Sequence, residues 1–400
     1  MSEQLERDIE AVLEARIGRE CVFMPSGRFA IHLAFQLLLS PGDRILMSPL
    51  EDDTVFFGAL AAGLRPVMAP VSAHDGNMRI DAIDGVPITD ILRRLRVYRG
   101  GPNNLRDFDD VSLLESPELL HAAGLAKSDQ EMTLLVSDAD LHTKAIKLSA
   151  LAPAPHEARV AALRYLAAPP VIDEASEWRS AFQNRPAALW LQEPDRAFRL
   201  VPILDLSAVY LQLKTNADAE NGERISAFLS QARRAMAEFR PQNVILDMRF
   251  NGGGDYTKTA SFMTDLPKMI AKDGRIFVIT DAATFSAGIT SVGFVKQASP
   301  LQTIIVGEPI GDRLVFYGEP RRLMLPNSRI GMNYATGLHD YLHGCRWFGP
   351  CYWVNWIYPV SVATLDPDLS APVSFAAVAA GRDPAIEAIR MSLGLPTPGP

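Results

Sequence analysis

Two short apolar runs in the second half of the chain predict buried strands, because both are continuous and end at turn-forming residues. The first starts at Val244 and leads into the glycine cluster Gly252–Gly254, and the second covers Ile276–Thr280. An apolar segment from Ile289 to Val295 follows the second run and predicts a helix. Ser286 therefore lies where a predicted strand turns into a predicted helix.

The first 75 residues alternate between helical and extended patterns. Helical patterns cover residues 3–17, 28–39 and 54–62, and strand patterns cover residues 20–24, 44–48 and 65–70. This βαβαβ order favours a parallel sheet. The pattern predicts an N-terminal α/β segment over residues 1–75.

The pattern changes over residues 76–150. Alternating apolar positions from Met78 end in a turn at Asp84-Gly85, residues 89–98 form an amphipathic helix pattern, and residues 132–136 form a strand pattern. We expect a small β-rich module here. Residues 151–199 are rich in Ala and Pro and predict a connector, and strands and helices alternate again over residues 200–395.

Length and composition exclude several classes of protein. The chain has 400 residues, a length that favours two or three domains. Its residues are 48% hydrophobic and 22% charged, a composition that can form a packed core. The net charge of −8 argues against a nucleic-acid partner held by phosphate contacts. Because no apolar run reaches 18 residues and the first ten residues are polar and acidic, we expect no membrane helix and no signal peptide.

Cysteine and histidine usage indicates neither a disulfide framework nor a metal site. The three cysteines are Cys21, Cys345 and Cys351; we expect reduced thiols in a cytoplasmic protein, although the last two could close a small loop. His339 and His343 are four residues apart, but they lie in a segment rich in glycine and aromatic residues. We therefore expect no metal.

The serine and the glycine cluster together indicate acyl-transfer chemistry. Backbone N–H groups at a helix start are unpaired and can stabilise an oxyanion, and glycines allow the backbone to approach a substrate carbonyl. Ser286 is the candidate nucleophile, and the Gly253/Gly254 region with Ala287 is the candidate oxyanion hole. The alternative for each motif alone is a flexible loop or a helix N-cap.

Several motifs in order resemble the tail-specific (C-terminal processing) and tricorn-type serine peptidases, over residues 78–392. The matching pieces are Asp84–Pro87, Leu246–Gly254 (a "DLRxNGGG" loop), Thr284–Ala287 (a "TFSA" motif), Val306–Pro309, Tyr317–Glu319, Leu325–Ser328 and Gly381–Pro384. The resemblance implies an α/β protein with a crotonase-like core of βα units and a small β-rich PDZ-like module. The module would present an extended peptide by strand addition.

The general base that the serine needs is not evident from the sequence. Tail-specific members use a lysine about two dozen residues after the serine, but Arg313 stands in that region here. Lys296 is ten residues past Ser286, about 15 Å along a helix. His142, in an Asp-Leu-His segment, and Glu319 are candidates for the base or its orienting group, with a polar turn as the alternative for each; His32 falls on an apolar helix.

Residues 2–73 resemble the first part of DegT-type PLP-dependent sugar aminotransferases. The resemblance rests on Met24–Leu33, Ser40–Pro49 and Ala61–Val67. A PLP enzyme needs a Schiff-base lysine, yet the first lysine of this chain is Lys127, beyond the resemblance. We therefore expect a structural or docking role without a cofactor, and an anion at Ser26-Gly27 stays open.

These observations favour a serine-type peptidase acting on peptide or protein substrates in the cytoplasm. The first alternative is an inactive peptide-binding pseudoenzyme that kept the groove and lost the base. The second is a PLP-dependent aminotransferase-like protein. The aromatic stretch of residues 347–356 could line a cleft or a homo-oligomer contact, or pack as a buried loop. No nucleic-acid or membrane partner is expected.

Overall fold

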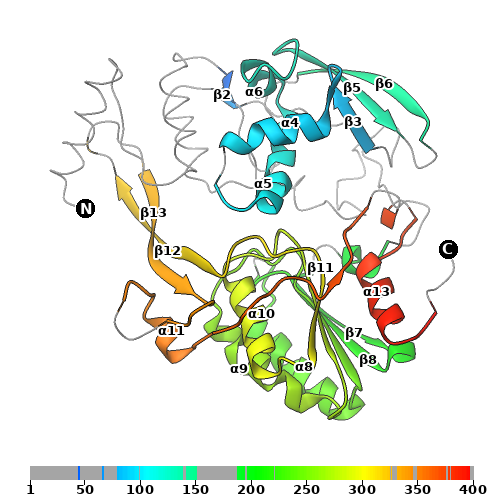
Figure 1. The fold of residues 1–400 in the computed structure, drawn as a ribbon, viewed down its shortest axis with the longest axis vertical. Helices are drawn as coiled ribbons and strands as arrows, with labels where there is room; N and C mark the ends of the chain where they lie inside the picture. The colour runs from blue at the N-terminus through cyan, green and yellow to red at the C-terminus, as the bar shows by residue number, and fades with distance from the viewer. Residues whose placement is uncertain are drawn as a thin grey trace. The chain divides into compact units, whose positions relative to one another are not determined.

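The computed structural model describes two compact units (Figure 1). The described residues are 44–45, 65–66, 79–98, 100–137, 141–150, 187–193, 196–219, 221–324, 326, 331–345, 349–374, 377–378 and 380–396. The first unit holds the described residues up to 150 and those of 319–336, and the second holds the described residues of 180–318 and from 337 onwards.

Little of the predicted N-terminal α/β segment lies within the described residues. Its two described strands, β1 (Arg44–Ile45) and β2 (Arg65–Pro66), pair in parallel, in agreement with the parallel sheet expected there. The Ser26-Gly27 turn and His32 lie outside the described residues. The resemblance to aminotransferases therefore stays a prediction.

The first unit contains an antiparallel sheet whose strand order is β4-β3-β5-β6. These strands are β3 (Arg79–Ile83), β4 (Val86–Pro87), β5 (Glu131–Ser137) and β6 (Thr143–Ser149). Three helices accompany it: α4 (Ile88–Leu95), α5 (Asn103–Asp110) and α6 (Pro117–Ala122). The expected helix and strand are present, whereas α5 and α6 were not predicted.

Buried and exposed residues alternate along β5, which shows that one face of this sheet packs against the helices. Met132, Leu134 and Val136 pack with Ile91 and Leu95 of α4. The turn between β3 and β4 is fixed by the Asp84 carboxylate, which accepts hydrogen bonds from the backbone N–H groups of Lys127 (2.7 Å) and Thr133 (2.9 Å). The unit is thus a helix-covered sheet, and its PDZ-like character stays a prediction.

The second unit is built on a six-stranded sheet with the order β14-β11-β10-β9-β8-β7. All neighbouring strands are parallel except β7, which pairs antiparallel with β8. The strands are β7 (Phe198–Ile203), β8 (Ala208–Leu213), β9 (Asn243–Asp247), β10 (Ile276–Thr280), β11 (Thr303–Gly307) and β14 (Leu369–Ser370). Because parallel strands end at the same edge, the loops after β8, β9 and β10 meet.

Helices cover both faces of this sheet (Figure 1). On one face lie α8 (Ile225–Phe239), α9 (Thr257–Asp265) and α10 (Ala287–Ala298); on the other lies α13 (Pro384–Ser392). Alternate residues of each strand enter the two cores: Val244 and Leu246 of β9 pack on the first side and Ile245 on the second. Burial on both faces explains the continuous apolar runs in the sequence.

The described chain also contains a two-stranded sheet and a short helix. The strands are β12 (Val315–Met324) and β13 (Gly331–Asp340), and the helix is α11 (Val354–Ile357). A disulfide joins Cys345 to Cys351, so the expectation of reduced thiols was wrong for this pair. The reason is tertiary, because both cysteines lie beside Leu338: Cys351 forms a β-bridge with it, and the Cys345 sulfur lies 3.9 Å from its carbonyl oxygen.

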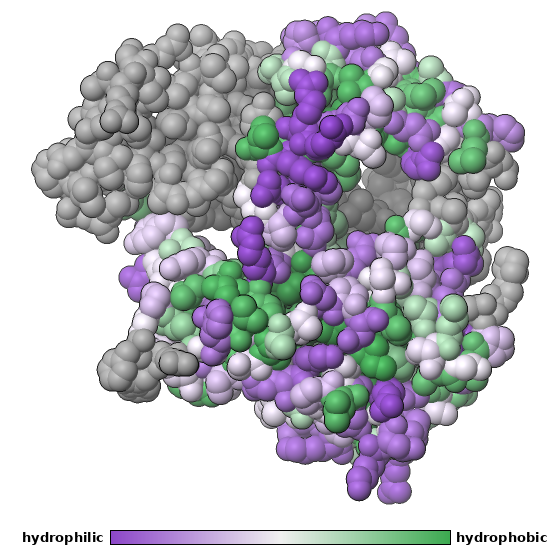
Figure 2. Space-filling view, in the orientation of Figure 1, coloured by the Kyte–Doolittle hydropathy of each residue, from purple (hydrophilic) through white to green (hydrophobic). Residues whose placement is uncertain are grey.

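The aromatic stretch of residues 347–356 is only partly buried. Val354 packs in the core of the second unit, while Trp353 is 56% exposed. Figure 2 shows apolar side chains at the surface of the second unit among polar ones. No helix among the described residues is long and apolar enough to cross a membrane. The cytoplasmic location and the homo-oligomer stay predictions.

Candidate active site

Ser286 stands in a constrained turn between β10 and α10. Its backbone angles, φ 51° and ψ −122°, are ones that L residues rarely adopt, so the surrounding contacts must hold the turn in place. The Phe285 N–H donates to the Asn251 carbonyl (2.9 Å), and the Thr284 hydroxyl donates to the Met248 carbonyl (2.9 Å). Two bonds therefore tie the turn to the end of β9.

The glycine cluster lies against this turn. A Cβ built on Gly253 would fall 2.7 Å from the Ser286 Cβ, 3.1 Å from its Oγ and 3.2 Å from the Ala287 nitrogen. Gly253 also has φ +117° and Gly254 φ +128°, values that favour glycine. Space and backbone angle both require glycine at position 253, beside the serine.

Two backbone N–H groups near Ser286 are candidate donors to a ligand, one on the glycine loop and one at the start of α10. The Gly253 N–H already donates to the Asn251 side-chain Oδ1 (3.1 Å). Within the part of the chain that the structure describes, neither the Ala287 N–H nor the Gly254 N–H donates a hydrogen bond. The loop places Gly253 as the wall of the site and leaves Gly254 and Ala287 as candidate donors to an oxyanion.

A buried ionic network supports the base of the glycine loop. The Arg249 guanidinium donates to both oxygens of the Asp247 carboxylate, at 2.5 Å from Nη2 to Oδ2, and to both oxygens of Asp383, at 2.9 and 3.1 Å. It also lies 4.7 Å from the Trp190 ring. Tyr210 donates to Asp247 (2.7 Å), and burial raises its pKa well above the ordinary value. The network joins β9 to the start of α13.

The carboxyl of Asp281 lies at the start of the serine-bearing turn. Its Oδ1 accepts hydrogen bonds from the backbone N–H groups of Ala283 (3.0 Å) and Thr284 (3.0 Å). Burial raises the pKa of this carboxyl to about 7, which the nearby Arg249 charge only partly offsets. The Asp281 carboxyl, which holds the turn that bears Ser286, therefore changes charge near neutral pH.

A second polar group fixes the far side of the glycine loop. The Asn216 N–H donates to the Gly253 carbonyl (2.7 Å), and its side-chain amide donates to Thr259 (3.0 Å) and Ser291 (2.7 Å). All three polar side chains are buried. Sequence reasoning missed these residues, because single Asn, Thr and Ser residues in apolar helices or loops form no recognisable pattern.

The candidate bases do not form a hydrogen bond with Ser286 Oγ in the structure. His142 is exposed, directly before β6, and Glu319 lies on β12 with φ +58°; both belong to the first unit, whereas Ser286 belongs to the second. Lys296 donates to the Thr303 carbonyl (2.9 Å) and pairs with Asp368. Ser286 Oγ has no hydrogen-bond partner among the described residues. The roles of His142 and Glu319 stay predictions.

One histidine that the sequence did not single out as a base reaches the serine turn indirectly. His339, on β13, is buried; its Nδ1 lies 3.0 Å from the Tyr341 hydroxyl, which lies 2.7 Å from the Thr290 hydroxyl. The N–H of Thr290 in turn donates to the carbonyl of Ser286 (3.3 Å). Burial lowers the pKa of His339 to about 4, so the imidazole is neutral at pH 7.

The described residues contain no group of three or more His, Cys, Asp or Glu side chains that could hold a metal ion. His343 pairs instead with Asp340, at 3.1 Å from its Nδ1.

The chain resembles solved peptidase structures only distantly. No family model and no curated protein matches the sequence. Mature CPAF in complex with lactacystin is 12% identical, with a TM-score of 0.46 and coverage of 81% of this chain and 78% of that one. A protein described as an S41 protease from Bacteroides fragilis NCTC 9343 is 12% identical, with a TM-score of 0.34 and coverage of 85% and 76%. One described as a peptidase from Parabacteroides merdae ATCC 43184 is 15% identical, with a TM-score of 0.32 and coverage of 49% of this chain and 64% of that one. Likenesses this distant do not establish a family for the chain.

Proposed function

We propose that this protein is a serine-type peptidase in which Ser286 attacks a peptide carbonyl. The observation that carries the proposal is the contact of Gly253 with Ser286: no side chain fits between the loop and the hydroxyl. In this proposal the substrate carbonyl carbon lies in front of the Ser286 hydroxyl, and the carbonyl oxygen accepts from the N–H groups of Gly254 and Ala287. That arrangement supports formation of a tetrahedral intermediate.

Each residue of the site has a proposed role. Ser286 is the nucleophile, the N–H groups of Gly254 and Ala287 stabilise the oxyanion, and Gly253 lines the approach. His142 and Glu319 stay the candidates for the base or its orienting group. The peptide-presenting role of residues 76–150 is part of the same proposal.

A second candidate function is a peptide-binding protein without catalysis. The observation that favours it is the lack of any hydrogen-bond partner for Ser286 Oγ among the residues described. A hydroxyl without a base is a weak nucleophile, although the turn and the glycine wall would still bind a carbonyl.

A fluorophosphonate probe separates these two functions. We expect labelling of the wild-type protein that disappears in Ser286→Ala. His142→Ala should also abolish labelling, whereas His121→Ala, an exposed histidine of the same unit, serves as the matched control and should not. A well-folded wild-type protein that takes up no probe, while a peptide aldehyde binds reversibly and Ser286→Ala does not weaken it, would favour the binding protein. Labelling that survives Ser286→Ala would overturn the proposed nucleophile.

A further inference from the structure

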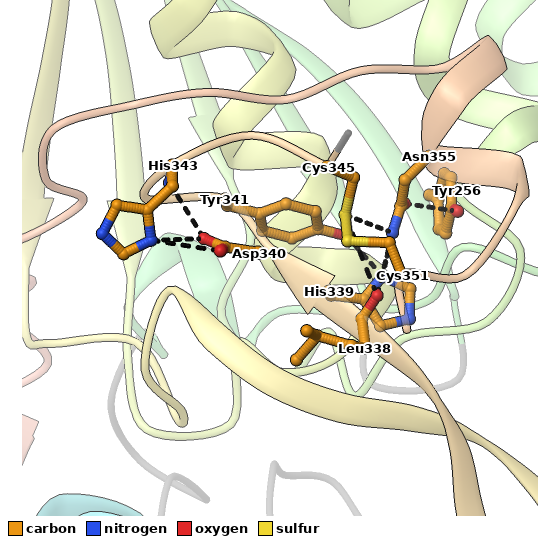
Figure 3. Close-up of a disulfide and its surroundings, with 9 residues drawn as sticks. All are labelled: Tyr256, Leu338, His339, Asp340, Tyr341, His343, Cys345, Cys351 and Asn355. Carbon is orange, nitrogen blue, oxygen red and sulfur yellow. Dashed lines mark hydrogen bonds and ion pairs between the residues drawn. A yellow bond between two sulfur atoms is a disulfide. The ribbon is translucent and has the colours of Figure 1, made fainter. Parts of the chain in front are cut away.

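The side-chain amide of Asn355 contacts two different segments of the proposed active site (Figure 3). Its Oδ1 accepts a hydrogen bond from the Tyr256 hydroxyl (2.8 Å). Its Nδ2 lies 3.2 Å from His339 Nδ1 and 3.4 Å from the Leu338 carbonyl. Because that carbonyl can only accept, the amide nitrogen must face β13 and the amide oxygen must face Tyr256.

The contact with Tyr256 leads to the glycine loop, and the contact with His339 leads to the Ser286 turn. Tyr256 follows the glycine loop after a single residue and immediately precedes α9, so its hydroxyl anchors the loop at its end. His339 leads through Tyr341 to Thr290, which binds the Ser286 carbonyl. The neutral imidazole accepts from Asn355, a role that its lowered pKa suits. Asn355 therefore connects the residue that follows the glycine loop, Tyr256, with the residues that lead to the Ser286 turn.

The position of Asn355 is itself fixed by the disulfide loop. The Nδ2 of Asn355 lies 3.6 Å from the Cys345 sulfur, and Cys351 forms a β-bridge with Leu338. The N–H of Tyr352 donates to the same Leu338 carbonyl (2.9 Å). Asn355 is buried, and the rings of Phe316 and Tyr352 pack on His339. A short cross-linked loop therefore holds the amide against β13.

We propose that Asn355 is a positioning residue that sets the spacing between the glycine loop and the Ser286 turn, and that the Cys345–Cys351 loop holds it in place. This inference rests on the proposed peptidase function of Ser286. A rigid link of this kind is needed because an oxyanion donor and a nucleophile on separate loops must stay within a few tenths of an ångström of their working spacing.

The test compares Asn355→Asp with Asn243→Asp. Aspartate keeps the shape and the acceptor for Tyr256 but cannot donate to His339 or Leu338. Asn243 is the matched control: it is also buried, and its amide donates to the Leu206 carbonyl (3.1 Å) and accepts from Arg275 N–H (3.0 Å), at the opposite end of β9 from the glycine loop. Both variants lose one buried donor, so both should lose stability.

Two readouts are measured on both variants: the rate of fluorophosphonate labelling and amide hydrogen exchange. We expect Asn355→Asp to slow labelling about tenfold and to speed exchange in peptides covering residues 249–258 and 284–292, unlike Asn243→Asp. Tyr256→Phe should affect mainly the first peptide and Tyr341→Phe mainly the second.

The two readouts keep the inference separate from the proposed function. If the wild-type protein is not labelled, the peptidase proposal fails, and the exchange pattern alone decides whether Asn355 positions the two segments. If labelling occurs but both aspartate variants slow it equally, or if exchange in the two peptides is unchanged in Asn355→Asp, the positioning role is overturned.

Discussion

Gly253 and Ser286 are packed so closely that a Cβ on the glycine would lie 2.7 Å from the Cβ of the serine. The same Cβ would lie 3.1 Å from the serine Oγ, and Gly253 has φ +117°. Two motifs that are separate in the sequence, a glycine cluster after β9 and a serine after β10, therefore form one surface. The parallel order of β9 and β10 explains why they meet.

Gly253→Ala should strongly reduce the reactivity of Ser286. The new methyl must displace the serine or the loop, and alanine also strains the positive φ. Displacement of the loop moves the neighbouring Gly254 donor, so we expect labelling by fluorophosphonate to fall by roughly 100-fold, the effect of losing one oxyanion donor. Gly252→Ala is the control, because no atom lies within 4 Å of its Cβ position. Equal labelling rates in the two variants would contradict the proposed geometry.

Ser286→Gly should be more stable than Ser286→Ala. Both variants remove the hydroxyl, but φ 51° strains alanine and not glycine, a difference of about 1 kcal/mol. Urea unfolding measures it. At Ser226, an exposed position of α8, the order should be reversed, because glycine weakens a helix relative to alanine. If alanine is the more stable at both positions, the strained turn is not present in solution.

Arg249→Met should destabilise the second unit by about 3–5 kcal/mol. The substitution leaves the Asp247 and Asp383 carboxylates buried without their partner. Arg382→Met is the control: its pair with Glu387 is partly exposed and should contribute less than about 1 kcal/mol. Thermal and urea unfolding of both variants give the comparison. Similar losses in the two variants would show that the buried network contributes little.

The Asp281 carboxyl should make stability depend on pH between about 4 and 7. Its pKa is raised from 3.8 to about 7 by burial, so in this window the folded state keeps a proton that the unfolded state has lost. Its contribution to the free energy of unfolding is therefore largest at low pH and decreases as pH rises towards 7. Asp281→Asn keeps the acceptor oxygen but cannot titrate.

Urea unfolding of wild type and Asp281→Asn at several pH values isolates this contribution, since other groups cancel in the difference. We expect the stability of the wild type relative to the variant to decrease as pH rises through the window. A difference that is constant or increases with pH would show that the carboxyl is ionised in the folded protein.

Breaking the Cys345–Cys351 disulfide should cost about 2 kcal/mol, the loop-closure entropy expected for so short a loop. The Cys345→Ser/Cys351→Ser double variant tests this, with Cys21→Ser as the control. Thiol titration of the unreduced, denatured protein should find one free thiol for the three cysteines of the sequence. Three free thiols would show that the bond does not form under the conditions of expression.

The sequence alone predicted β9, β10 and α10 and the serine turn between the last two. Strands buried on both faces read as continuous apolar runs, and a hydroxyl residue between such a run and a helix is visible without tertiary information. The glycine cluster was visible for the same reason. Local patterns also predicted α4 and β5 of the first unit, within a few residues.

Only the tertiary structure decided what surrounds the serine. Asp383 binds Arg249, Asn216 binds the Gly253 carbonyl, and Asn355 connects Tyr256 with His339. Each is a single polar residue whose partner is far away along the chain, so it leaves no periodicity or motif to detect. Three cysteines in a long chain favoured reduced thiols, and a bond between Cys345 and Cys351 was only the alternative; in the fold both cysteines lie beside Leu338 and are joined. The local pattern of apolar and polar residues determines which strands and helices form. Buried hydrogen bonds between polar groups at the ends of the parallel strands determine how the loops after these strands are arranged.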